Sequence, residues 1–306
     1  MDKGAFGDLD AIEKREKKEY PHTLEALIEA EEKIKPKILG RYPSYPRETD
    51  KYLDVLSLAG EALKKTDYTE KDIENFVLSQ SGSGENESEE MFIGIYAGAI
   101  VENLGRRKGR KKTIIAIDGK GRKFNYLFHC IRNFGEIYLS NFNGTYICHN
   151  AASYGKGEIL VLNRVKGNGN GGYAGSKGKI GLAILNETGA VNEFTILRQM
   201  INFGYNEKFN IERFVIKEKN VKLSKMAQVF KREIEVPELL EVYKLSEETI
   251  NGNKPGSLYE TTRVQKIKIK SKEKKEINSL TEEMESAEIG EMADIAKRIR
   301  ELCYEQ

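Results

Sequence analysis

Four short apolar stretches in the middle of the chain end in Asp or Asn and recur at a nearly constant interval. They occupy residues 114–118, 137–141, 159–163 and 182–186, and their first residues lie 23, 22 and 23 positions apart. A second register keeps this period, because Cys130, Ser153 and Ser176 are spaced by 23. A unit of about 22 residues cannot bury its own apolar side and must stack on its neighbours. The pattern predicts a short parallel β-helix over residues 113–192, with adjacent coils about 4.8 Å apart.

The polar residues that end these stretches predict a structural ladder formed by Asp118, Asn141, Asn163 and Asn186. Asp and Asn suit turns, and in register they can also hydrogen-bond from one coil to the next. Alternating βα units are the competing interpretation. The segments between the strands argue against them, because these segments are rich in Gly and Asn or irregularly aromatic and lack a helical period.

Helical spacing of apolar residues predicts three amphipathic helices before this repeat. The first begins after Pro21 and is limited by Pro36, the second ends near residue 65, and the third follows a capping box formed by Thr69 and Asp72.

A polar loop over residues 79–90 then leads to an apolar helix over residues 91–104, which Ser88 can cap. Because the open end of a β-helix exposes backbone groups and apolar side chains, we expect this last helix to cover the first coil.

Beyond the repeat the pattern is less regular. Residues 194–219 can add a closing coil, residues 224–250 read as two short helices split by Pro237, and residues 262–272 read as an edge strand rich in lysine. The last helix, residues 277–304, nearly follows a heptad with a slip at Gly290, which is typical of a helix that packs back or self-associates.

The predicted fold class is therefore α+β. The predicted domains are a helical region (1–110), a β-helix (111–219) and a C-terminal region of helices with an edge strand (220–306).

The repeat resembles the glycine-rich parallel β-helix found at the C-terminus of glutamate synthase large subunits and in a formylmethanofuran dehydrogenase subunit. The resemblance rests on residues 157–163, 167–171 and 178–182 and covers about a quarter of the chain. Those repeats usually turn on glycine where this chain has Asn. The likeness implies a scaffold fold, without a reaction or an active-site residue.

Composition limits the kind of partner and the cellular compartment that we expect for this chain. The 50 basic and 48 acidic residues nearly cancel, so a charged partner must be recognised by a local patch. Cys130, Cys148 and Cys303 are too few for a disulfide framework, which favours a reducing, cytoplasmic location. The N-terminal residues lack the pattern of a signal peptide. The longest apolar run, residues 91–101, is shorter than the ~20 residues of a membrane span, so no membrane association is expected.

One local patch does occur, as six cations in seven residues between the apolar helix and the first coil. Such a run can bind phosphates with the nearby Phe124, Tyr126 and Phe128 stacking on bases, or it can be a solvated connector over which the acidic residues 85–90 fold. The predicted nucleic-acid-binding residues are Arg106, Arg107, Lys108, Arg110, Lys111 and Lys112.

Three further motifs are weaker. Gly167, Gly169 and Gly172 match a dinucleotide-binding fingerprint but lead into another strand, so turn glycines explain them better.

The pairs His129–Cys130 and Cys148–His149 contain four potential zinc ligands. On strands, however, adjacent side chains point to opposite faces, so no metal or other cofactor is predicted.

Asp118 can be a general base or, as its position favours, a turn residue. No nucleophile motif is present and no catalytic residue is predicted. The expected function is that of a scaffold or protein-interaction module, which binds a partner protein or self-associates through residues 277–304. The alternatives are nucleic-acid binding through residues 106–112 or a nucleotide-dependent enzyme at the glycine-rich coil.

Overall fold

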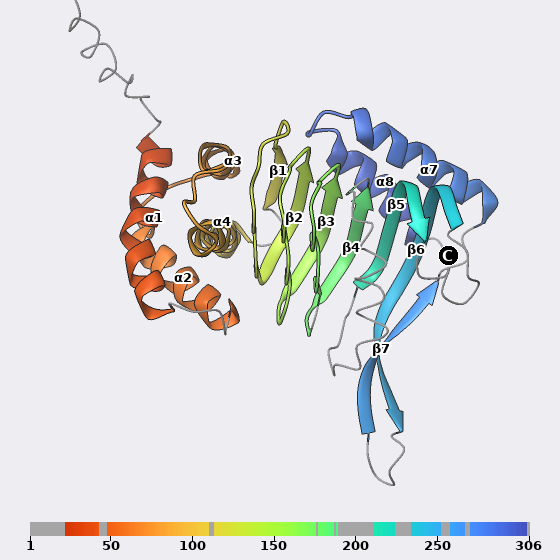
Figure 1. Ribbon diagram of the computed structural model, residues 1–306, viewed down its shortest axis with the longest axis horizontal. Helices are drawn as coiled ribbons and strands as arrows, with labels where there is room; N and C mark the ends of the chain where they lie inside the picture. The colour runs from red at the N-terminus through yellow and green to blue at the C-terminus, as the bar shows by residue number, and fades with distance from the viewer. Residues whose placement is uncertain are drawn as a thin grey trace, which may run out of the picture.

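The computed structural model describes residues 22–42, 48–109, 113–175, 177–186, 188, 211–223, 234–251, 258–266 and 270–304, with side chains between 211 and 266 described only at Val215. Helices α1 to α4 lie at one end, a seven-stranded sheet follows in chain order, and α7 and α8 cover one face of it (Figure 1). The predicted α+β class with a short parallel β-helix is confirmed. No helix within these ranges is long and apolar enough to cross a membrane.

The four N-terminal helices are α1 (His22–Arg41), α2 (Glu48–Ala62), α3 (Glu70–Ser79) and α4 (Glu87–Lys108). The capping box of Thr69 and Asp72 is confirmed. Two expectations were wrong. Helix α1 continues through Pro36, because Ile34 and Ile38 on either side of it are buried in the core. The N-cap of α4 is Asn86, which accepts a hydrogen bond from the amide of Glu89, and not Ser88.

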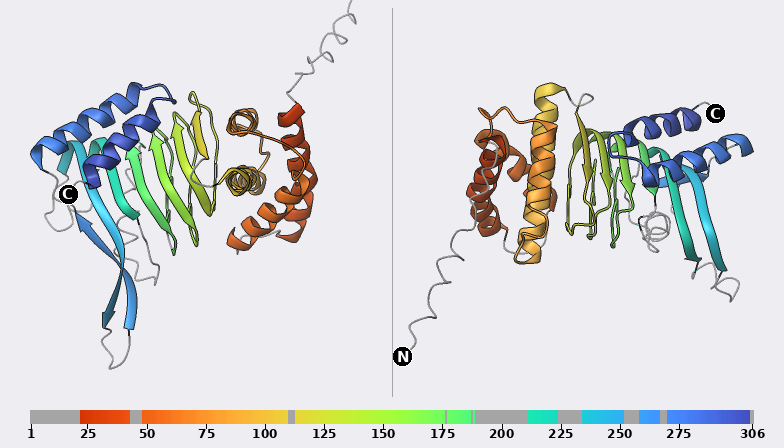
Figure 2. Two further views of the ribbon diagram at one scale, coloured as in Figure 1. Left: turned by 180° about the vertical axis from the view of Figure 1, so that it is seen from behind. Right: turned by 90° about the horizontal axis from the view of Figure 1, so that it is seen from above.

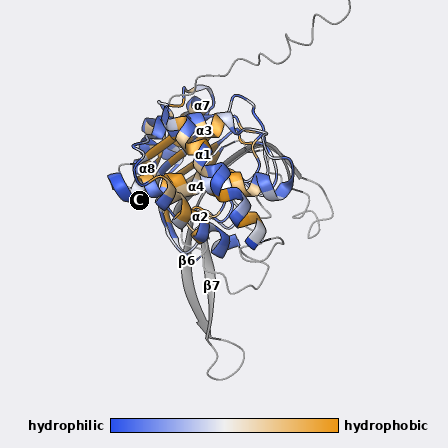
Figure 3. Ribbon diagram, turned by 90° about the vertical axis from the view of Figure 1, so that its left-hand side faces the viewer, coloured by the Kyte–Doolittle hydropathy of each residue, from blue (hydrophilic) through white to orange (hydrophobic). Residues whose placement is uncertain are grey.

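Helix α4 covers the first coil, as predicted. Its residues 91–105 are all buried, because α4 packs on the coil on one side and on α1 and α2 on the other, with α3 beside it (Figures 1 and 2). A Cβ on Gly94 would lie 1.9 Å from the carbonyl oxygen of Tyr126, so only glycine permits this approach of helix to coil. Figure 3 shows the four helices in front of the coils, with hydrophobic and hydrophilic residues on each. We call these four helices the cap.

The strands of the β-helix are β1 (Ile114–Asp118), β2 (Asn133–Ser140), β3 (Lys156–Asn163) and β4 (Lys179–Asn186), all parallel. The register differs from the predicted one at β2, where Ile114 pairs with Glu136 and not with Ile137. A slip of one residue exchanges the two faces of a strand, so Ile137 and Leu139 point into the coil while Tyr138 points outward. This register places the aliphatic side chains of β2 inside the coil and leaves Glu136, Tyr138 and Ser140 on the outer face.

The predicted ladder is correspondingly altered. Asp118, Ser140, Asn163 and Asn186 occupy one register position, and Asn141 lies one residue beyond it. The hydrogen bonds still run from coil to coil. Asn186 Nδ2 donates to Asn163 Oδ1 (2.8 Å), Asn163 Nδ2 donates to Ser140 Oγ (3.1 Å), and Asn141 Nδ2 donates to Asp118 Oδ1 (2.9 Å).

The sheet continues through β5 (Ile211–Leu223), β6 (Ile234–Asn251) and β7 (Leu258–Lys266). Strand β5 adds a parallel strand to β4, where a closing coil was predicted. The prediction of two helices over residues 224–250 was wrong, because β6 pairs along β5 despite Pro237, and it thereby covers the edge that the last coil would leave open. Strand β7 is the edge strand. It begins before the predicted residue 262, and residues 267–269 lie outside the described ranges.

The predicted C-terminal helix is two helices, α7 (Ser271–Ser286) and α8 (Met292–Tyr304), because the chain turns over residues 287–291 at the slip near Gly290. Both pack on the outer face of the sheet (Figure 2). Their buried residues Ile277, Met284, Ile295 and Ile299 share a core with outward residues of β2, β3 and β4. The apolar positions from which self-association was predicted thus have contacts within the chain.

Candidate functional site

The segments that return each coil from one strand to the next have positive φ at every second residue. In the second coil Tyr146, Cys148, Asn150, Ala152 and Tyr154 all have φ between 53° and 58°. Backbone amides donate from coil to coil along these segments, for example Tyr126 N to Thr145 O (2.8 Å) and Cys130 N to His149 O (2.9 Å). We call these segments the turn half of the β-helix and the strands its strand half.

In the turn half, the first two coils are not aligned as the spacing of Cys130, Ser153 and Ser176 predicted. Tyr126 stacks on Tyr146 at 5.2 Å and His129 stacks on His149 at 5.4 Å with an interplanar angle of 3°, so these coils are offset by 20 residues and not by 23. Cys130 therefore lies beside Asn150, and the equivalence of Cys130 with Ser153 was wrong. The turn segment of the first coil is therefore shorter than that of the second. At the start of β2 and β3 the offset is again 23 residues, because Asn133 pairs with Lys156. Ser176 lies outside the described residues.

A polar cluster forms where the cap meets this turn half. Glu48, the first residue of α2, places its Oε2 2.9 Å from His129 Nε2, 3.0 Å from Asn150 Nδ2 and 3.8 Å from Cys130 Sγ. Three donors thus converge on one carboxylate oxygen. His129 is 1% exposed, and its other ring nitrogen, Nδ1, is buried without a hydrogen-bond partner among the described residues.

The charges in this cluster follow from burial and from these contacts. Burial raises the pKa of Glu48, but the hydrogen bond and charge of His129 and the contacts of His149 and Asn150 outweigh burial and lower it overall. Burial, with the neighbouring Glu48 carboxylate, raises the pKa of the Cys130 thiol. Burial and the proximity of His129 lower the pKa of His149 to about 4. At neutral pH the cluster holds a carboxylate, a thiol and, at His149, a neutral imidazole.

The two Cys/His pairs do not have the strand geometry that their sequence predicted. Both pairs lie on the turn half, and Cys130 (φ 60°) and Cys148 (φ 53°) have left-handed backbones. His129 and Cys130 both contact Glu48, whereas Cys148 is fully buried in the core of the coil. The structure therefore joins one Cys/His pair to a residue 81 positions away in the sequence, and it leaves Cys148 out.

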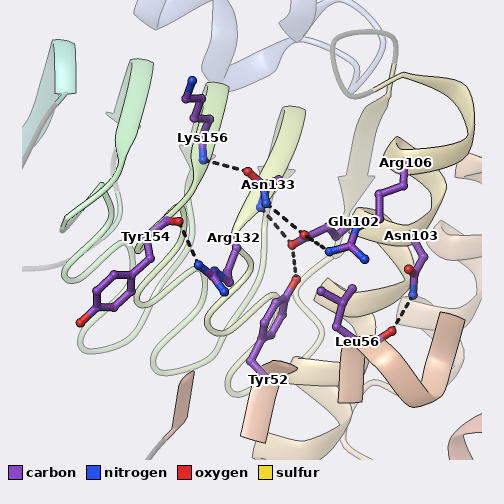
Figure 4. A network of polar contacts seen from close by, with 9 residues as sticks. All are labelled: Tyr52, Leu56, Glu102, Asn103, Arg106, Arg132, Asn133, Tyr154 and Lys156. Atoms are coloured by element: carbon purple, nitrogen blue, oxygen red, sulfur yellow. Dashed lines mark hydrogen bonds and ion pairs between the residues drawn. The ribbon is translucent and has the colours of Figure 1, made fainter. Parts of the chain in front are cut away.

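A second junction network surrounds Glu102, a buried carboxylate of α4 (Figure 4). Glu102 accepts hydrogen bonds from Tyr52 Oη (2.8 Å), from the amide of Asn133 (3.1 Å) and its Nδ2 (3.0 Å), and from Arg106 (3.0 Å). Because each oxygen has two donors, this carboxylate is satisfied without a ligand. Its role is to fix α4 and α2 to the start of β2.

The first three cations of the predicted basic run belong to the last turn of α4. Arg106 pairs with Glu102, Lys108 pairs with Glu70 (2.8 Å), and Arg107 donates to the carbonyls of Leu63 and Thr66. Arg110, Lys111 and Lys112 lie outside the described residues. The three described cations thus have structural contacts at a helix C-terminus, where positive charge is favoured.

The acidic residues 85–90 were expected to fold over this run. Glu87 and Glu90 instead contact the first coil, through Tyr126 and Asn125 respectively.

A row of cations crosses the coils at the start of the strands. Lys156 and Lys179 are register partners, Lys177 lies 5.1 Å above the ring of Tyr154, and Arg132 donates to the carbonyl of Tyr154 (3.1 Å). Tyr154 is 48% exposed. Figure 4 shows Arg132, Tyr154 and Lys156 on neighbouring coils, with Arg106 on the cap side of Glu102 and Asn133. We call Arg132, Tyr154, Lys156, Lys177 and Lys179 the basic ridge.

The remaining motifs have local roles. Residues 168–175 turn into β4 without an intervening helix, so the glycines lack the helix N-terminus that a dinucleotide site needs. Asp118 accepts hydrogen bonds from the amide of Lys120 (2.9 Å) and from Asn141, as a turn residue does.

Comparison of the chain with family models, curated proteins and solved structures finds no match. The sites therefore rest on geometry alone. Sequence reasoning missed Glu48 and Asn150, for which no local signal exists, because the three segments meet only through the docking of α2. It also missed Lys156 and Lys179, whose separation of 23 residues equals the repeat and could have revealed the ridge.

Proposed function

We propose that this protein is a binding module without catalytic activity, whose basic ridge recognises a nucleic acid strand. The observation that carries the proposal is the distribution of charge on the coils. Residues 113–186 contain nine Lys and Arg but three Asp and Glu, and eight of the nine cations are exposed while the three carboxylates are half-buried. A chain that is nearly neutral as a whole thus presents a positive solenoid.

The surfaces available for binding support the ridge as the site. Among the described residues, the cap covers one end of the coils, β5 to β7 extend the sheet at the other end, and α7 and α8 cover its outer face. Lys156 and Lys179 are register partners on adjacent strands and both are exposed, so they place two positive charges side by side on the surface of the coils. A phosphate backbone supplies anions for these charges, and Tyr154 offers a ring on which a base can stack.

The experiment measures binding of a labelled single-stranded RNA and of a DNA of the same sequence by fluorescence anisotropy at several salt concentrations. We expect the triple variant Lys156→Ser, Lys177→Ser and Lys179→Ser to bind at least about tenfold more weakly and to show a shallower salt dependence. The matched control, Lys33→Ser, Lys64→Ser and Lys297→Ser, removes the same charge from exposed positions outside the coils and should bind as the unmodified chain does.

Two further variants separate the alternatives. Lys111→Ser with Lys112→Ser tests the basic run, and Tyr154→Ala tests stacking, which we expect to contribute about 1 kcal/mol or more. Absence of binding at low salt, or equal losses in the triple variant and its control, would show that the ridge has no such role. Retention on heparin without binding of RNA or DNA would also reject a nucleic acid partner.

A further inference from the structure

We propose that Glu48, His129 and Cys130 bind one divalent cation of the zinc class where the cap meets the turn half. Their ligand atoms are a carboxylate oxygen, an imidazole nitrogen and a thiol sulfur, and all three lie within 4.8 Å of one another. These are the ligand types that zinc prefers in proteins, and the thiolate in particular selects against magnesium and calcium. The proposal is independent of the basic ridge.

The distances between the three ligand atoms need to change only slightly for the hydrogen-bonded cluster to become a metal site. Zinc bonds of about 2.0–2.3 Å in a tetrahedron hold neighbouring ligand atoms about 3.3–3.7 Å apart. Glu48 Oε2 and Cys130 Sγ are already 3.8 Å apart, and Glu48 Oε2 and His129 Nε2 must separate only slightly from 2.9 Å. Three protein ligands leave a fourth tetrahedral position for water.

The protons and charges of the three ligands balance when a divalent cation binds. A cation that binds Cys130 displaces the thiol proton to solvent, because a coordinating thiol is deprotonated even where burial disfavours the free thiolate. Coordination through Nε2 of His129 moves the ring proton to Nδ1, which has no partner in the described chain. The Glu48 carboxylate and the Cys130 thiolate then neutralise the two positive charges, so the buried site carries no net charge.

Neighbouring residues hold the ligands in place. Asn150 donates to Glu48 Oε2 from the adjacent coil, and His149 stacks on the His129 ring at 5.4 Å. Such outer contacts orient the ligands of a metal and raise its affinity. Because Glu48 belongs to α2 and the other two ligands to the first coil, an ion bound here would link the cap to the β-helix.

The test uses the full chain, reduced and stripped with a chelator. We expect it to bind one equivalent of Zn²⁺ in competition with a chromophoric chelator, and Co²⁺ in its place should give a thiolate-to-metal charge-transfer band. Cys130→Ala should abolish this band and weaken Zn²⁺ binding by more than about 100-fold. Glu48→Gln, which keeps the shape of the side chain, should weaken it by about 10-fold or more.

Cys303→Ala provides the matched control, since Cys303 is also a buried cysteine outside any disulfide but lies on α8, in the core between that helix and the sheet. It should retain the band and the affinity, and circular dichroism should show that every variant is folded. Binding of less than one equivalent at micromolar protein, a band that persists in Cys130→Ala, or a band lost in Cys303→Ala would overturn the proposal. In that case Glu48, His129 and Asn150 form only a hydrogen-bonded contact between cap and coil.

Discussion

The strand half and the turn half of each coil stack on their neighbours through different contacts. The strand half is covered on its outer face by α7 and α8, so residues on both sides of β3 and β4 are buried. Within the described chain, the turn half contacts the cap, for example through Glu48 of α2. Its backbone alternates in the sign of φ, and rings stack on it from one coil to the next.

Under the two proposals above, this contrast separates a side that stabilises the solenoid from a side that binds ligands. In the strand half, parallel strands need cover on both faces, so large apolar residues occupy most positions and leave little room for chemistry. In the turn half, the conformations that send each coil back bring the buried His129 and Cys130 against Glu48 of the cap, and the exposed Lys156 and Lys179 lie where the turn half meets the strands. The following predictions test whether the two halves depend on different contacts.

The largest effect is expected in the strand half, from removal of its cover. Ile299→Asp places a carboxylate in the interface between α8 and the sheet, where Ile299 is fully buried. We expect a loss of about 4 kcal/mol in the free energy of unfolding and increased binding of a hydrophobic dye, because the outer face of the sheet becomes exposed.

Urea denaturation measures the stability change. Lys297→Asp, on an exposed position of the same helix, is the control and should cost less than about 1 kcal/mol. If the two variants are equally stable, the strand half does not depend on α8.

A smaller but still severe effect is expected in the turn half from Gly144→Ala. A Cβ at Gly144 would lie 1.9 Å from the carbonyl oxygen of Phe124 on the adjacent coil, so backbone must move against backbone. We expect a loss of about 3 kcal/mol with altered near-ultraviolet circular dichroism, since the stack of Tyr126 and Tyr146 lies next to this point.

Gly40→Ala is the control. A Cβ there meets nothing within 4 Å, and alanine favours the helix, so its stability should stay equal or rise by about 0.5–1 kcal/mol. Comparable losses in the two variants would mean that close coil contact does not limit the turn half.

The two halves also differ in how far their sequences predict them. Strand period, end cap and fold class follow from apolar spacing, because each strand must meet its neighbour in register. The register of β2 was predicted wrongly because Asn141 matches Asn163 in residue type, whereas Ser140 is the register partner of Asn163. In the turn half, Cys130 pairs with Asn150 only because the first coil is shorter there, and Glu48 reaches the cluster through tertiary packing of α2. The spacing of residues along the chain therefore predicts neither the position of Cys130 beside Asn150 nor the contact of Glu48 with the cluster.

The mildest prediction concerns the amide ladder, where the strand half meets α7. Asn163 donates to Ser140 Oγ and to the carbonyl of Met284 (2.9 Å), and it accepts from Asn186. Asn163→Ala leaves buried polar groups unpaired, so we expect a loss of about 2 kcal/mol. Asn141→Ala removes one half-exposed hydrogen bond to Asp118 and should cost about 0.5 kcal/mol. Urea denaturation of both variants compares the register position with the residue beside it. A larger loss at Asn141 than at Asn163 would contradict the register of β2, because the ladder would then run through the position that the apolar spacing alone predicts.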